Sequence, residues 1–128
     1  MANVLITGTS SGIGLATALE CARAGHKVFA TMRNPAGAPQ LGEVAKRESL
    51  PIEIRSLDVD SDKSVHDCFA NINEAIDALV NNAGVERHGS IEELPIEAFV
   101  DTMNTNYFGA VRCIRAVLPR MREPITTS

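Results

Sequence analysis

Residues 4–14 read Val4-Leu5-Ile6-Thr7-Gly8-Thr9-Ser10-Ser11-Gly12-Ile13-Gly14, an apolar run followed by a loop with three glycines, and an alanine-rich helical pattern comes next. Gly8 lets the chain turn out of a strand, Gly12 leaves the backbone open to a pyrophosphate, and Gly14 lets the helix pack closely. The N-terminus of that helix offers N–H groups and a positive dipole end to an anion. A tight turn with a close helix contact needs the same glycines without a ligand, so the loop alone leaves both interpretations open.

Two further motifs follow in order along the chain. Asn81-Asn82-Ala83-Gly84 comes directly after the apolar run Ala78-Leu79-Val80, and Asn106-Tyr107-Phe108-Gly109 lies in a long helical pattern. Together with the Gly-x-x-x-Gly-x-Gly loop, these motifs resemble those of the classical short-chain dehydrogenase/reductase family. The resemblance runs from residue 4 to about residue 122 and implies a nicotinamide cofactor.

Strand and helix patterns alternate along the chain. Strands are predicted at 3–7, 27–32, 52–57 and 78–81, and helices at 12–24 and 40–49. Ser61 is the predicted N-cap of a third helix, whose apolar positions are Val65, Phe69, Ile72 and Ile76. The longest helix is expected to bury a seam made of Phe99, Met103, Tyr107, Ala110, Ile114, Val117 and Met121.

This alternation implies an α/β fold with a parallel sheet and right-handed crossovers. With the resemblance it predicts a Rossmann-type doubly wound sheet of strand order 3-2-1-4, truncated after the fourth strand. Residues 1–122 are then the N-terminal part of an NAD(P)-binding domain, and residues 123–128 are a tail at the truncation point. Relatives continue into another strand here, whereas this chain reads Glu123-Pro124-Ile125-Thr126-Thr127-Ser128, so a truncation or a frame change is expected.

The composition argues against several classes of partner. The 128 residues carry a formal charge of −4, which does not favour nucleic acid or an anionic membrane surface. No apolar run reaches membrane-spanning length and no leader pattern precedes the first strand, so a cytoplasmic protein is expected. Three widely spaced cysteines predict reduced thiols, and three histidines without ligand spacing predict no metal site.

The end of the second predicted strand bears on the choice of cofactor. An acid at this place accepts from the ribose 2′-hydroxyl of NAD, whereas a cation accommodates the 2′-phosphate of NADP. The chain has Met32-Arg33-Asn34 here, without a carboxylate. Arg33 can pair with a phosphate in a bidentate way, so NADP(H) is favoured over NAD(H). The alternative is that Arg33 is a solvated loop arginine. Some NADP-preferring members of the resembling family have a basic residue at the position of Ser11, and this chain does not.

The resemblance also implies the other cofactor contacts. Asp58 is expected to bond the adenine amino group, with the backbone of Val59 completing the contact, and Asn82, Ala83 and Gly84 are expected to border the ribose. The phosphates are expected at the loop residues Gly8, Ser10, Ser11, Gly12, Ile13 and Gly14. From the residues alone, the segment 58–61 also fits a helix cap, which is the role predicted for Asp60, and Asn81 and Asn82 also fit a tie between loops.

Asn106 is the one catalytic residue expected in this chain. An amide inside an apolar seam is costly unless its hydrogen bonds are met, and in the resembling family the matching asparagine holds a water in a proton relay. The alternative is a satisfied core amide at a helix bend. The family's proton donor is a tyrosine in Tyr-x-x-x-Lys. Here the only tyrosine is Tyr107, Val111 lies four residues on, and no lysine follows Lys63.

The resemblance therefore implies an oxidoreductase that transfers a hydride between NADP(H) and a small carbonyl or alcohol substrate, of which this chain carries the cofactor-binding half. The alternative is an inactive dinucleotide-binding fragment. The full-length enzyme is expected to be a homo-oligomer. The 128-residue chain, with the fourth strand as an exposed edge, is expected to be marginally stable and to associate. The residues Thr-Met-Arg at 31–33 and Asn-Tyr-Phe-Gly at 106–109 look most like those of the hydroxysteroid dehydrogenase branch, by analogy only.

Overall fold

The computed structural model describes residues 1–123, so most of the predicted tail lies outside the described residues. Its strands and helices alternate as expected. In chain order they are β1 (Asn3–Ile6), α1 (Gly12–Arg23), β2 (Lys27–Met32), the short 3₁₀ helix η1 (Pro35–Gly37), α2 (Gln40–Glu48), β3 (Ile52–Ser56), α3 (Asp62–Ala70), β4 (Ala78–Val80), α4 (Ile96–Met103), the π-helical turn η2 (Asn104–Phe108) and α5 (Gly109–Arg122).

The four strands form one parallel sheet in the order β3-β2-β1-β4, which confirms the predicted topology. Leu5 of β1 lies opposite Phe29 of β2 on one side and Leu79 of β4 on the other. Because all strands run the same way, their carboxyl ends meet at one edge of the sheet. Within residues 1–123, β3 and β4 each have a strand partner on one side only.

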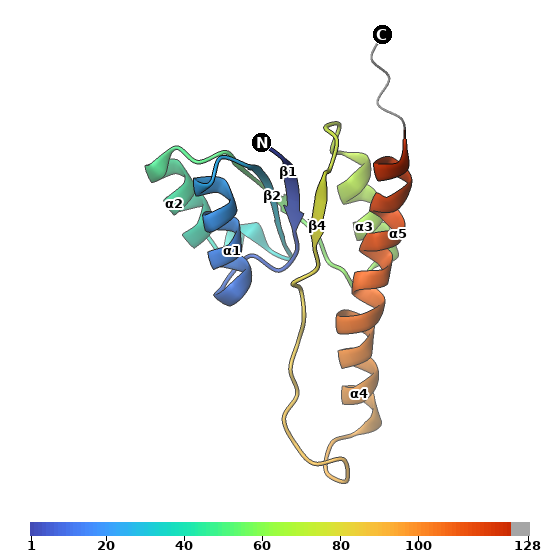
Figure 1. The fold of residues 1–128 in the computed structure, drawn as a ribbon. Helices are drawn as coiled ribbons and strands as arrows, with labels where there is room; N and C mark the ends of the chain where they lie inside the picture. The colour runs from blue at the N-terminus through green and yellow to red at the C-terminus, as the bar shows by residue number, and fades with distance from the viewer. Residues whose placement is uncertain (124–128) are drawn as a thin grey trace.

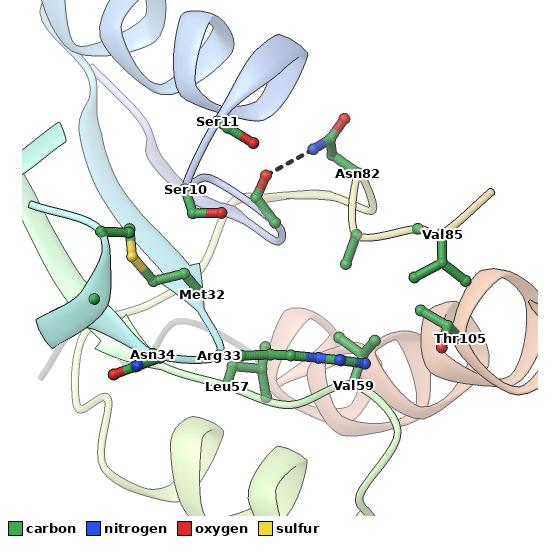
Figure 2. A pocket seen from close by; sticks show the side chains of 15 residues that line it. Ser10, Ser11, Met32, Arg33, Asn34, Leu57, Val59, Asn82, Val85 and Thr105 are labelled. Atoms are coloured by element: carbon green, nitrogen blue, oxygen red, sulfur yellow. Dashed lines mark hydrogen bonds between the residues drawn. The ribbon is translucent and has the colours of Figure 1, made fainter. Parts of the chain in front are cut away.

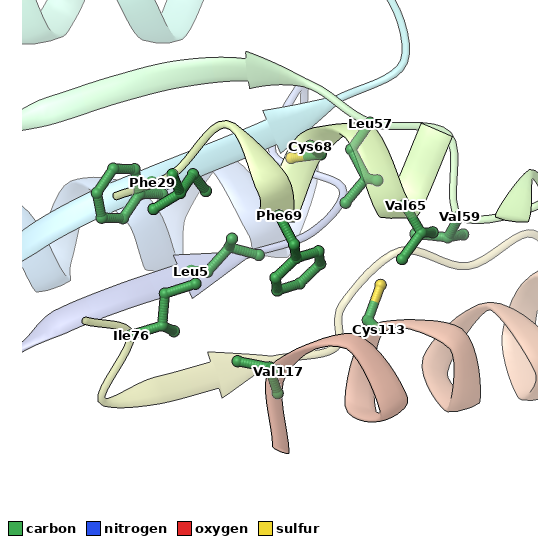
Figure 3. Close-up of a cluster of buried hydrophobic side chains, with 11 residues drawn as sticks. Leu5, Phe29, Leu57, Val59, Val65, Cys68, Phe69, Ile76, Cys113 and Val117 are labelled. Carbon is green, nitrogen blue, oxygen red and sulfur yellow. The ribbon is translucent and has the colours of Figure 1, made fainter. Parts of the chain in front are cut away.

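Helices cover both faces of the sheet: α1 and α2 lie on one face, and α3 and α5 on the other (Figure 1). The alternation of side chains along a strand explains the two cores. Val4 and Ile6 of β1 pack toward Ala18, Ala22 and Leu41. On the opposite face, the second core contains Leu5, Phe29, Leu57, Val59, Val65, Cys68, Phe69, Ile72, Ile76, Cys113 and Val117 (Figure 3).

Helix α3 begins at its predicted cap, since the hydroxyl of Ser61 accepts a hydrogen bond from the N–H of Ser64. It ends earlier than its apolar spacing suggested. Ile72 and Ile76 are buried, but they belong to the segment after α3. The guanidinium of Arg120 on α5 donates to the carbonyl of Phe69, in the last turn of α3, and to those of Ile72 and Glu74 in this segment. These hydrogen bonds replace the helical ones that the chain gives up.

The predicted seam of the longest helix is wrong in its register. The helix is divided by η2, and the seam residues Phe99, Met103 and Tyr107 are 37%, 51% and 56% exposed. The buried positions are Thr105, Gly109, Cys113 and Val117, of which only Val117 belonged to the predicted seam. The π turn adds a residue per turn and so rotates the side chains of α4 relative to those of α5.

The beginning of α4 projects beyond the carboxyl ends of the strands, and the chain that follows β4 runs alongside it (Figure 1). Each helix in residues 1–123 is too short or too polar to traverse a lipid bilayer.

Candidate functional site

A cavity of about 510 Å³ lies at the carboxyl edge of the sheet (Figure 2). The segments that follow all four strands contribute to its walls, and η2 adds one residue. The lining residues are Gly8, Ser10, Ser11, Met32, Arg33, Asn34, Gly37, Ala38, Leu57, Val59, Asn82, Ala83, Gly84, Val85 and Thr105. In an open α/β sheet this edge is where ligands bind, because the loops after neighbouring strands leave a crevice there.

The three glycines of the first loop are required for different reasons. Gly8 has φ +70°, and a Cβ there would come within 2.8 Å of the Ala83 Cα. A Cβ on Gly14 would overlap the Gly8 carbonyl and the Asn82 amide. Gly12 has φ +59° with open space where a side chain would lie. Gly14 thus allows α1 to pack against its own loop, while Gly12 leaves the backbone accessible.

Helix α1 presents its N-terminus to this loop. Ser11 is the N-cap in an extended conformation, and within the described residues its side chain makes no capping hydrogen bond. The first-turn N–H groups of α1 therefore lack a side-chain cap, as an anion site requires. Ser10 and Ser11 line the cavity, whereas Gly12, Ile13 and Gly14 do not, and the Ile13 side chain is exposed.

Asn82 ties the loops after β1 and β4 together, as one of the two sequence interpretations predicted. Its Nδ2 donates to the Gly8 carbonyl at 2.9 Å (Figure 2). The buried Thr7 hydroxyl accepts from the N–H groups of Asn82, at 3.0 Å, and Ala83, at 2.9 Å. These three hydrogen bonds hold Ala83 and Gly84 against the cavity.

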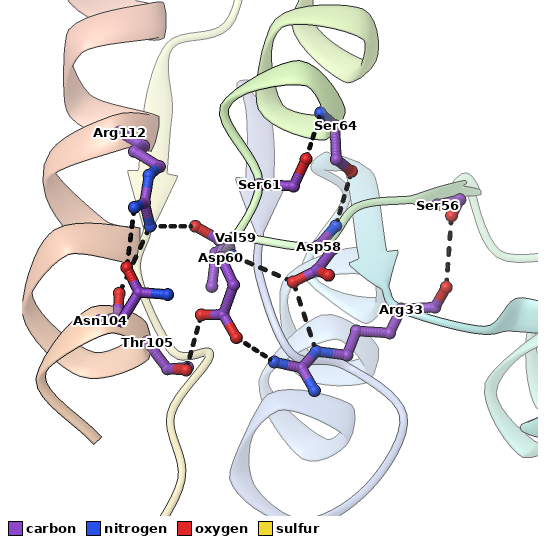
Figure 4. Close-up of polar contacts among 10 residues, drawn as sticks. All are labelled: Arg33, Ser56, Asp58, Val59, Asp60, Ser61, Ser64, Asn104, Thr105 and Arg112. Atoms are coloured by element: carbon purple, nitrogen blue, oxygen red, sulfur yellow. Dashed lines mark hydrogen bonds and ion pairs between the residues drawn. The ribbon is translucent and has the colours of Figure 1, made fainter. Parts of the chain in front are cut away.

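Arg33, directly after β2, faces two carboxylates from the segment after β3 (Figure 4). Its Nε lies 3.5 Å from Asp58 Oδ1, and its Nη2 lies 2.7 Å from Asp60 Oδ2. The predicted capping role of Asp60 is therefore wrong: Ser61 caps α3, and Asp60 instead pairs with Arg33 and accepts from the Thr105 hydroxyl at 2.6 Å.

The neighbouring residues after β3 are held by the backbone as well as by side chains. Asp58 Oδ1 accepts from the N–H of Asp60, and the N–H of Asp58 donates to the Ser64 hydroxyl. Val59 lines the cavity, whereas Asp58 does not. The adenine contact expected of Asp58 stays a prediction.

Asn106 lies on η2, one residue beyond the cavity wall. Its Oδ1 accepts from the Val85 N–H at 2.8 Å, and its Nδ2 donates to the Val85 carbonyl at 2.9 Å. Its side chain is exposed in this chain, so the premise that it lies within a buried apolar seam is wrong. The two bonds fasten the loop after β4 to η2, and a role in a proton relay stays a prediction.

Sequence reasoning missed seven lining residues. The carboxyl-edge rule could have found Met32, Asn34 and Leu57, because they are neighbours of predicted residues at strand ends. The cavity also receives Gly37, Ala38, Val85 and Thr105, for which the chain carries no local signal. Thr105 reaches the site because η2 turns it toward Asp60, forty-five positions earlier in the sequence.

The parallel sheet, the glycine loop, the uncapped helix N-terminus and the cavity at the carboxyl edge define a Rossmann-type α/β protein with a candidate ligand site. The chain belongs to the short chain dehydrogenase family, whose profile matches residues 2–127.

Relatives support the same conclusion. Human retinol dehydrogenase 8 is 44% identical over 125 residues, which cover 94% of this chain and 40% of the relative. Human 17-beta-hydroxysteroid dehydrogenase type 1 is 38% identical over 127 residues, which cover 94% of this chain and 39% of that protein. The chain thus spans about 40% of the length of these curated relatives.

Among solved structures, the fold is similar to a gluconate 5-dehydrogenase from Burkholderia cenocepacia in complex with NADP and tartrate. The TM-score is 0.85 at 29% sequence identity, over 94% of this chain and 48% of that one. The likeness confirms the predicted Rossmann-type sheet and the family resemblance.

Proposed function

We propose that this chain binds NADP(H) and forms the cofactor-binding part of an oxidoreductase that transfers a hydride between NADP(H) and a carbonyl or alcohol carbon. The observation that carries the proposal is the convergence of the glycine loop, the α1 N-terminus and Arg33 on one cavity. A volume of about 510 Å³ falls within the roughly 300–1,000 Å³ of cofactor and ligand pockets.

The residues present fit a dinucleotide. The loop at Ser10 and Ser11 and the first N–H groups of α1 would hold the pyrophosphate, because uncapped N–H groups and open space at Gly12 suit an anion. The segment 82–84 would border the nicotinamide ribose, and Asp58 with the Val59 backbone would hold the adenine. Arg33 would face the 2′-phosphate.

When bound, the cofactor supplies or accepts the hydride, and the chain positions it. Carbonyl reduction also needs a proton donor, for which the family's Tyr-x-x-x-Lys has no counterpart in these 128 residues. We therefore expect this chain alone to bind the cofactor without turning it over. Asn106 would act through the loop after β4, whose Val85 backbone it holds beside the cavity.

The second candidate function is a dinucleotide-binding fragment without catalysis. The observation in its favour is that Tyr107 is the only tyrosine and that no lysine follows Lys63. Both candidates predict cofactor binding. They differ in whether a longer chain that contains these residues reduces carbonyl compounds with NADPH.

Cofactor titration tests the proposal. NADPH and NADH would be titrated into the 128-residue chain and followed by nicotinamide fluorescence. We expect NADPH to bind more tightly, and Arg33→Ala to weaken NADPH about tenfold while NADH changes less than about twofold, because only NADPH carries the phosphate. Arg47→Ala, on the exposed side of α2, is the matched control. Equal affinities for the two cofactors, or an unchanged preference in Arg33→Ala, would contradict the assignment of Arg33.

A further inference from the structure

Arg33 is the only cation among the described residues that line the cavity, and no carboxylate lines it. Directly behind Arg33, however, lie Asp58 and Asp60. Together these three side chains carry a formal charge of −1. A 2′-phosphate that approaches Arg33 therefore meets a guanidinium whose charge is already balanced.

The geometry of the guanidinium sharpens this point. Nε and Nη2 form the side-on edge of the planar fork, one of its two edges that can bind an oxyanion with two parallel hydrogen bonds. In the structure this edge is taken by the two carboxylates, at 3.5 Å for Asp58 and 2.7 Å for Asp60 (Figure 4). A phosphate would have to displace the closer carboxylate or bind at the end-on edge, where it shares Nη2 with Asp60.

Asp60 is held in place by more than Arg33. Its Oδ1 accepts a 2.6 Å hydrogen bond from the hydroxyl of Thr105, and its own N–H donates to Asp58 Oδ1. Thr105 is buried on η2. These bonds leave Oδ2 directed at Nη2 of Arg33, so the carboxylate is oriented as a competitor and does not swing freely into solvent.

We propose that Asp60 is a specificity-determining residue, a carboxylate that competes with the 2′-phosphate of the cofactor for Arg33 and thereby limits the preference for NADP(H) over NAD(H). Thr105 is its positioning residue. The inference rests on the proposed function, because it requires a dinucleotide in the cavity. The preference for NADP(H) over NAD(H) then depends on the difference in free energy between two pairings of Arg33, one with the 2′-phosphate and one with Asp60.

Binding measurements on charge-neutral variants test the inference. Asp60→Asn keeps an oxygen that can accept from Thr105 and removes the charge. We expect the affinity for NADPH to rise about fivefold, because Asp60 no longer competes for Arg33, and not by more, because exposed ion pairs are individually weak. The affinity for NADH should change by less than about twofold. Asp62→Asn is the matched control: it removes the same charge two residues on, where the carboxylate pairs with Arg112. It should change neither affinity.

The combination of Asp60→Asn with Arg33→Ala separates competition from general repulsion. Without Arg33, Asp60 has no guanidinium to occupy, so the Asp60→Asn gain in NADPH affinity should disappear. A gain that persists in the Arg33→Ala background, or an Asp60→Asn chain with an unchanged or lower NADPH preference, overturns the inference. If Asp60→Asn loses NADH binding through unfolding, Asp60→Ser supplies the same comparison.

The titration also separates this inference from the proposed function. A wild-type chain that binds neither cofactor contradicts both. A wild-type chain that prefers NADPH, with Asp60→Asn unchanged, contradicts the role of Asp60 alone.

Discussion

Gly12 and Gly14 lie two residues apart and are constrained in opposite ways. Gly14 has no room for a Cβ because the Gly8 carbonyl and the Asn82 amide occupy that space. Gly12 has room but adopts φ +59°, which costs an L-residue about 1 kcal/mol or more. We therefore expect a side chain at Gly14 to disturb the fold and one at Gly12 to disturb chiefly the proposed pyrophosphate site.

We predict that Gly14→Ala lowers the free energy of unfolding by about 3 kcal/mol, since overlap with the backbone outweighs the ~1 kcal/mol that alanine gains in a helix. Gly12→Ala should cost only about 1 kcal/mol but should weaken NADPH binding strongly, because the methyl group covers the pyrophosphate approach. Urea unfolding and NADPH titration measure the two effects. Equal losses of stability in both variants would contradict this explanation.

Cys113 provides a test of burial at the same scale. Burial raises the pKa of its thiol to about 11 from an ordinary value of 9.0. The neighbouring Cys68 raises this pKa by a smaller amount. A raised folded-state pKa means that the folded form disfavours the thiolate. Below pH 9 the thiol is protonated in both the folded and the unfolded chain, and stability does not depend on it. As the pH rises toward 11 only the unfolded chain ionises readily, so the free energy of unfolding falls by roughly 2–3 kcal/mol.

We expect the urea midpoint of the wild type to fall between pH 9 and pH 11 more steeply than that of Cys113→Ala, which lacks the titrating group. Below pH 9 the alanine variant is less stable because it leaves a cavity, so the slopes are compared and not the absolute values. Parallel pH curves for the two chains would show that Cys113 stays unionised or is hydrated in the folded state.

At the scale of elements, two arginines of α5 attach this helix to the two ends of α3 and to the segments beside them. Arg112 donates to the Val59 carbonyl and to the Asn104 side chain (Figure 4). It also donates to Asp62, and it thereby joins the start of α3 to η2. Arg120 donates to the carbonyls of Phe69, at 2.8 Å, Ile72, at 2.6 Å, and Glu74, at 2.9 Å, and so replaces the missing end of α3.

We predict that Arg120→Met, which keeps most of the apolar stem, lowers the free energy of unfolding by about 2 kcal/mol because three carbonyls lose a charged donor. Hydrogen exchange of amides 71–76 should become faster. Arg115→Met, on the exposed side of the same helix, should change stability by less than about 0.5 kcal/mol. An Arg120→Met chain that matches the Arg115→Met chain would contradict the capping role.

At the scale of the whole molecule, α4, η2 and α5 carry an apolar row that the described residues leave partly exposed. Its members are Val100, Met103, Tyr107, Ile114, Leu118 and Met121, which are between 38% and 60% exposed. The sheet also ends at β4, whose outer edge has no strand partner within residues 1–123. A row of apolar side chains and an unpaired strand edge both favour contact with another surface.

We predict that the 128-residue chain associates at micromolar concentration, and that Met103→Lys combined with Ile114→Lys increases the fraction of monomer, because charges on the row oppose its burial. Sedimentation velocity measures the distribution, with Glu43→Lys on the exposed face of α2 as the control for added charge. A monodisperse wild-type monomer with a sharp cooperative melt would contradict the prediction.

Local patterns in the sequence determined the elements and their order. The run into Gly8 and the N-cap Ser61 are each recognisable within a few residues, because turns and caps depend on short-range backbone geometry. The parallel sheet and its order followed from the alternation and the family resemblance. Eight of the twelve predicted cofactor residues line the cavity, since they lie at strand ends.

Only the tertiary structure decided which partners those side chains have. Arg33 meets Asp60 across 27 positions, and Thr105 meets Asp60 across 45. The register of α5 on the sheet depends on η2 and on Gly109, where a Cβ would lie 2.7 Å from Val59 Cγ2. Periodicity identifies an apolar row but not which row is buried. That choice depends on the fit between surfaces distant in the sequence, and local patterns carry no information about it.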